Sequence, residues 1–127
     1  MKKLFVLTLL FFGFLSHAQL VFKNRDSKGA LPKFIIKNGD TEIYGKLGGK
    51  INLLEVFDQV PELYDNRDGK SRYKMTKTTS DNIARRTYEI SYTLYRQTQK
   101  YTANIKYTID FHDKRPTKVF NEYFDIN

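Results

Sequence analysis

The feature that most constrains the fold is a strict alternation of apolar and polar residues across positions 101–111. Successive side chains of a β-strand point to opposite faces, so this pattern predicts a half-buried antiparallel strand. Residues 88–95 alternate in the same way, and the short polar link at 97–100 predicts that the two segments form a hairpin. A turn at 112–116 and a third strand at 117–126 complete the predicted meander.

The first half of the chain predicts shorter strands. The dipeptide Asn38-Gly39 separates residues 33–37 from residues 41–46, and it favours a hairpin because both of its positions tolerate a positive φ. The remaining strand candidates are residues 20–23 and residues 70–77, the second of which is expected to lead into a loop at 78–83.

One short helix is expected near residues 52–60. The apolar residues of this segment recur at the spacing i, i+3, i+4 and i+7, which is typical of one helix face: Leu53, Val56, Phe57 and Val60. Asn52, followed three residues later by Glu55, fits a capping box that satisfies free backbone donors of the first turn. A strand over residues 50–57 is the alternative interpretation.

Together these elements predict a mainly β protein, with an α+β arrangement as the alternative. We expect five to seven antiparallel strands to form a curved sheet or a small open barrel that packs on the short helix. The chain has 127 residues, of which 40% are hydrophobic, and this suffices for a single β-rich domain at residues 19–127. It contains no cysteine, which excludes disulfides, cysteine nucleophiles and thiolate metal sites.

Residues 1–18 have the three-part layout of a secretory signal peptide. Lys2 and Lys3 precede an apolar run at 4–15, and small residues follow it up to Ala18, after which we expect cleavage. The run is too short to cross a bilayer core, which needs roughly 20 apolar residues, so we expect no transmembrane span. The layout resembles a bacterial export signal and predicts a mature protein in the periplasm, at the cell surface or in the medium.

The positive charge of the mature chain is concentrated in residues 70–100. The full chain carries 22 basic and 14 acidic side chains, and the loss of Lys2 and Lys3 would leave a basic excess of six. Residues 70–100 hold eight basic side chains against Asp81 and Glu89, which accounts for that whole excess.

Strand geometry predicts that many of these cations share one polar face of the sheet. Residues two apart on a strand point to the same side, and neighbouring strands add hydroxyl and amide groups there. Such a face can hold an acidic polymer or a glycan, and the alternative is a solvated face that prevents edge pairing. Nucleic acid is not expected as the ligand of an exported chain. The expected ligand-binding residues are Lys70, Arg72, Lys74, Arg85, Tyr95 and Lys106.

Side chains that could carry catalysis are sparse. His112 is the only histidine that remains after the expected cleavage, so we expect neither a metal site nor a cofactor. Glu122 lies between Phe120 and Phe124 on one face of the last predicted strand, a setting in which a carboxyl can become a general acid. A glycosidase needs a second carboxylate nearby, and Asp110 is expected to point to the other face. No catalytic residue is therefore assigned.

The sequence favours an exported, non-enzymatic binding or interaction protein. Its expected partner is an acidic polysaccharide or another protein. Two alternatives stay open at this point: an inhibitor or immunity-type protein that blocks an enzyme through Tyr95 and the loops, and a small carboxylate-dependent hydrolase that uses Glu122.

Overall fold

The computed structural model describes residues 19–126, and the predicted signal peptide at 1–18 lies outside this range. Within it the chain forms nine β-strands and no helix. In chain order these are β1 (Gln19–Asn24), β2 (Lys33–Lys37), β3 (Asp40–Leu47), β4 (Lys50–Phe57), β5 (Glu62–Asp65), β6 (Lys70–Ser80), β7 (Ala84–Tyr95), β8 (Lys100–Phe111) and β9 (Lys118–Asp125).

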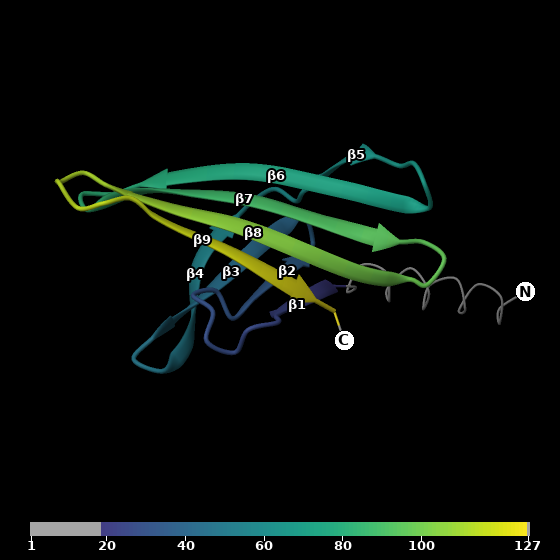
Figure 1. Cartoon of the computed structure of the whole chain (residues 1–127), viewed down its shortest axis with the longest axis horizontal. Coiled ribbons are helices and arrows are strands. Elements are labelled where there is room, and N and C mark those ends of the chain that lie inside the picture. The colour runs from purple at the N-terminus through teal and green to yellow at the C-terminus, as the bar shows by residue number, and fades with distance from the viewer. Residues whose placement is uncertain (1–18, 127) are drawn as a thin grey trace, which may run out of the picture.

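All nine strands belong to one antiparallel sheet with the order β4-β3-β2-β1-β9-β8-β7-β6-β5. β1 lies in the middle of the sheet, and the chain runs outward from it to β4. It then crosses to the opposite edge at β5 and returns strand by strand to β9, beside β1. Figure 1 shows the sheet curled on itself, with β1–β4 crossing the long strands β6–β9. The predicted curved antiparallel sheet is thus confirmed as a half-barrel.

The core lies on the concave face, between the two halves of the curled sheet. Phe22 of β1 stacks on Phe34 of β2 with 4.5 Å between the ring centroids, and Phe34 meets Phe124 of β9 edge-on at 5.0 Å. Ile90 of β7 and Ile105 of β8 are fully buried beside them. The alternation that predicted the meander is confirmed, because its apolar positions form this core.

The predicted helix at 52–60 is wrong, because residues 50–57 form the edge strand β4. Gly48 and Gly49 both adopt a positive φ, 59° and 78°, which makes a tight turn and sends the chain back along β3. The pairing of β3 with β4 contains a bulge that skips Leu54. A bulge inserts one extra residue and changes the phase of the alternation, so a strand acquires spacings of three that resemble a helix face.

The strand count was also underestimated, since five to seven strands were expected. The two additional strands are the edges of the sheet: β4, which confirms the alternative interpretation of residues 50–57, and β5, which was not predicted. The expected loop at 78–83 begins only after Ser80, because β6 continues along β7 through a pair of threonines. The hydroxyls of Thr78 and Thr87 face each other at 3.3 Å. Threonine has high strand propensity, and such cross-strand pairs stabilise a sheet.

Candidate functional site

The predicted polar face exists on the convex side of β6–β9, opposite the core. The strand register sets Lys70 beside Tyr95, Arg72 beside Thr93, and Lys74 beside Ser91. The next strand continues these rows, with Thr102 next to Thr93 and Asn104 next to Ser91. The polar face is defined by Lys70, Arg72, Lys74, Ser91, Thr93, Tyr95, Thr102, Asn104, Lys106 and Tyr123.

Two predicted residues lie apart from the centre of this face. Lys106 pairs with Glu89, one row further along the strands than Asn104. Arg85 lies opposite Asp110, eight residues from Thr93 along β7, which corresponds to about 26 Å at roughly 3.3 Å per residue. The structure therefore brings Lys70, Arg72, Lys74 and Tyr95 together with Lys106 at the border, and it leaves Arg85 outside.

The polar face is less basic than the sequence of residues 70–100 predicted. The guanidinium of Arg72 forms an ion pair with Asp65 of β5 at 2.9 Å, and the Lys106 ammonium lies 4.0 Å from the carboxylate of Glu89. Asp65 lies outside the segment over which the charge was summed, but β5 pairs with β6 and places it there. The face is thus mixed in charge rather than uniformly positive.

The two remaining lysines of β6 on this face contact aromatic rings instead of carboxylates. The Lys70 ammonium lies 5.5 Å from the centroid of the Tyr95 ring, and the Lys74 ammonium lies 4.5 Å from the Tyr64 ring. A cation over a ring is held by the ring quadrupole and keeps its charge uncompensated. These two ammonium groups are consequently available to an anionic ligand.

The carboxyl of Asp65 is strongly held in its ionised form. A hydrogen bond from the Arg67 side chain is the main cause that lowers the pKa of Asp65 to about 2, and the Arg67 backbone N–H and the charge of Arg72 act in the same direction. Asp65 thus stays anionic beside the polar face at neutral pH, and it holds the Arg72 guanidinium in an ion pair.

Two neighbouring hollows share Arg25 and Tyr123, one on the polar face and one beside it. One has a volume of about 160 Å³ and the other about 240 Å³. The first is lined mainly by hydroxyl and amide groups of β7 and β8: Ser91, Thr93, Thr102 and Asn104. The second is lined by Asn24, Arg25, Asp26, Asn121, Glu122 and Tyr123.

Arg25 is fixed between the two hollows by a bidentate ion pair. Its Nε donates to Oδ2 of Asp125 at 2.8 Å and its Nη2 donates to Oδ1 at 3.0 Å, while its guanidinium carbon lies 5.9 Å from the centroid of the Tyr123 ring. Sequence reasoning missed both Arg25 and Tyr123. The alternation of β9 could have placed Tyr123 on the convex side, because Glu122 and Phe124 next to it were expected to face inward.

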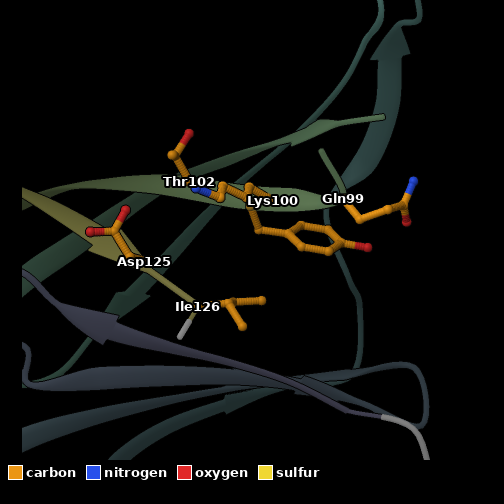
Figure 2. Close-up of a pocket in the computed structure, with 6 residues that line it drawn as sticks. Gln99, Lys100, Thr102, Asp125 and Ile126 are labelled. Atoms are coloured by element: carbon orange, nitrogen blue, oxygen red, sulfur yellow. The ribbon is translucent and has the colours of Figure 1, made fainter. Parts of the chain in front are cut away.

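A third and larger hollow of about 590 Å³ continues from the first at the end of β8 (Figure 2). Thr102 lines both of them. The pairing of β8 with β9 ends at Thr102 and Asp125, so β8 runs beyond its neighbour and the sheet opens there. Figure 2 shows Lys100 and Thr102 on β8, with Asp125 and Ile126 at the end of β9 across the opening. The three hollows are therefore neighbours that share lining residues, although the largest is also lined by Tyr101 and Ile126, which pack against the core.

Glu122 has a structural function in this fold. Its side chain accepts the backbone N–H groups of Ala30 at 2.9 Å and Leu31 at 2.8 Å. Both carboxylate oxygens are thereby engaged in holding the loop between β1 and β2 against β9. A Cβ on Gly29 would lie 2.7 Å from the Glu122 carboxylate, which shows how closely this loop packs on it.

His112 likewise joins two turns of the sheet. Its Nε2 lies 2.8 Å from the backbone carbonyl oxygen of Asp81 and 3.3 Å from the hydroxyl of Ser80. Its backbone N–H donates to the carbonyl of Ile83 at 3.0 Å. In residues 19–126 no group of three or more His, Cys, Asp or Glu side chains is placed to hold a metal ion.

Comparison of the chain with models of known protein families finds no match, and comparisons with curated proteins and with solved structures find none either. In the part of the chain that the structure describes, no helix has the length and apolar character needed to cross a membrane.

Proposed function

We propose that this protein is an exported, non-enzymatic binding protein that holds an acidic polysaccharide along the polar face. The observation that carries the proposal is the group of three neighbouring hollows on and beside that face. Thr102 links the first and the largest hollow, and Arg25 with Tyr123 links the first to the one beside β1. Several neighbouring open hollows suit an extended, repeating ligand better than a small molecule, which would prefer one enclosed pocket.

The chemistry of the lining favours sugar rings that carry spaced negative charges. Ser91, Thr93, Thr102 and Asn104 supply donors and acceptors that match sugar hydroxyls. The half-exposed ring of Tyr123 offers an apolar surface against which the C–H face of a sugar can pack. Lys70, Lys74 and Lys100 lie along the border and can meet carboxylates of the polymer. Because Arg72 and Lys106 are paired with acids, the face is poorly suited to a densely charged polymer such as nucleic acid.

The experiment is a titration of the purified protein with polygalacturonate, an acidic polymer, and with dextran, a neutral one. We expect binding to polygalacturonate that weakens as salt is raised, because fixed cations release counterions from the polymer. Replacing Tyr123 with Ala should weaken binding about tenfold through loss of the ring surface. Replacing Lys74 and Lys100 with Gln should reduce the dependence of affinity on salt.

The matched control is Lys118→Gln, which removes an exposed lysine of β9 at the opposite end of the strand from the hollows. This variant should bind polygalacturonate as the unaltered protein does. Equal binding of both polymers, or a salt dependence that is unchanged by the loss of Lys74 and Lys100, would contradict the proposal. Export is tested separately, by a mass measurement that finds Gln19 as the first residue of the protein recovered outside the cytoplasm.

A further inference from the structure

The edge strand β4 carries an unusual concentration of exposed apolar side chains. Ten large apolar side chains are exposed in residues 19–126, and seven of them lie between positions 47 and 64, on or beside the two edge strands. On β4 itself, four of the eight residues are of this kind: Ile51, Leu53, Leu54 and Val56. Clusters of this kind on a sheet edge mark contact surfaces, since isolated edges are normally protected by charges or proline.

The backbone of β4 is also available for pairing. In the described part of the chain β3 is its single strand neighbour, so the opposite side of β4 presents free N–H and C=O groups. Figure 1 shows the turn end of the β3–β4 hairpin projecting away from β6–β9, so a partner can approach it there, whereas Glu55 and Phe57 nearer the other end of β4 contact Thr79 and Tyr88. The other edge, β5, is much less suitable: it has four residues, directly follows Pro61 and contains a bulge.

Charge indicates which partner fits. Lys50 begins β4, and Asp58 directly follows its end, so opposite charges stand at the two ends of one strand. They are about 26 Å apart at roughly 3.3 Å per residue, too far to meet within one molecule. In residues 19–126 neither of them forms an ion pair. An antiparallel copy of the same strand would set each basic end against an acidic end.

We propose that β4 pairs in an antiparallel manner with β4 of a second copy of this chain, about a two-fold axis near Leu53 and Leu54. This pairing places Ile51 opposite Val56, and Asn52 opposite Glu55, with Lys50 close to Asp58 of the other copy. The two bulges then meet at the axis. Both copies use the same edge, so the contact is self-complementary and closes as a dimer. The dimer extends beyond the proposed ligand function and does not depend on it, because the polar face belongs to the other half of the sheet.

The experiment is sedimentation equilibrium of the purified protein over a range of concentrations, together with a charge swap. Lys50→Glu and Asp58→Lys each create two like-charge contacts in the dimer and should raise its dissociation constant about tenfold. The double variant exchanges the charges of both ends and should restore the affinity. If β4 bound a different protein instead, the double variant would not restore the affinity, because the charges of that partner would be unchanged.

Val56→Lys adds a charge to the contact and should leave the protein monomeric. The control is Val119→Lys, which replaces a similarly exposed valine on β9 and should leave the dimer intact. Circular dichroism checks that both variants keep the sheet. A monomer at every concentration would overturn the proposal, and so would single charge variants that the double variant does not rescue. Dimers insensitive to all β4 changes, or masses beyond two copies, would equally overturn it.

Discussion

Tyr88 is the largest of the fully buried side chains, and its two ends contribute in opposite ways. Its ring stacks on Tyr107 with 4.8 Å between centroids and meets Phe57 of the opposite half at 5.6 Å, so it joins the two halves of the curled sheet. Its hydroxyl has no hydrogen-bond partner in the described part of the chain. Burial raises the pKa of this hydroxyl, so it remains neutral. The ring therefore stabilises the core while the hydroxyl opposes it.

Replacing Tyr88 with Phe should raise the free energy of unfolding by about 1 kcal/mol, because it removes a buried polar atom that makes no bond and keeps the ring contacts. Replacing it with Ala should lower the same quantity by about 3–5 kcal/mol, since the ring contacts are lost and a cavity is left. Urea unfolding measures both changes. A Phe variant less stable than the unaltered protein would contradict this and show that the hydroxyl makes a stabilising hydrogen bond in the folded protein.

Among the elements, the loop between β1 and β2 depends on one carboxylate of β9. Glu122→Ala would leave the N–H groups of Ala30 and Leu31 without their acceptors, and we expect the free energy of unfolding to fall by about 2–3 kcal/mol. Glu122→Gln keeps one oxygen as an acceptor and should lose about half as much. Denaturant unfolding distinguishes a structural role of Glu122 from a purely catalytic one. A carboxylate with a catalytic role alone could be replaced without lowering the free energy of unfolding.

Alternation sufficed to predict the strands that bury one face, and it failed for the strand that buries almost nothing. In β6–β9 the core selects every second residue, so the pattern survives in the sequence. In β4 only Phe57 is buried, and the bulge at Leu54 changes the phase. Leu53 and Val56 therefore stand three residues apart, as they would on one face of a helix, although both are exposed on a strand.

The candidate site was half predictable for a similar reason. Residues of the β6–β8 meander are joined by short turns, so their rows follow from the sequence once the hairpins are recognised. Arg25 reaches the same face only because β1 pairs with β9, and its partner Asp125 is 100 positions away. A pairing between the two ends of a domain leaves no local pattern. Asp65 was missed for a different reason: it is only seven positions from Arg72, but no strand was predicted over residues 62–65.

At the scale of the whole molecule, aspartates fix three turns of the C-terminal meander. Backbone N–H groups of Ala84 and Ile83, with the Arg86 side chain, lower the pKa of Asp81 to about 2. The pKa of Asp65 is lowered to the same value, mainly by the Arg67 side chain. The backbone N–H of Arg115 is the main cause that lowers the pKa of Asp113. Asp65 ends β5 at the β5–β6 turn, and Asp81 and Asp113 lie in the β6–β7 and β8–β9 connections, where all three accept backbone hydrogen bonds of their turns.

The sheet should therefore lose stability in acid within a defined range. A carboxyl whose pKa is lower in the folded than in the unfolded protein stabilises the fold above its unfolded pKa, which is 3.8 here. That contribution is lost as the pH falls toward the folded pKa of about 2. We expect the melting temperature to decline between about pH 4 and pH 2, and Asp65→Asn with Asp81→Asn to make this decline shallower while lowering the melting temperature at neutral pH. Asp68→Asn changes a charge in the same turn as Asp65 and serves as the control, with an unaltered slope. If the double variant kept the full slope, the acid sensitivity would have to come from groups other than these turns.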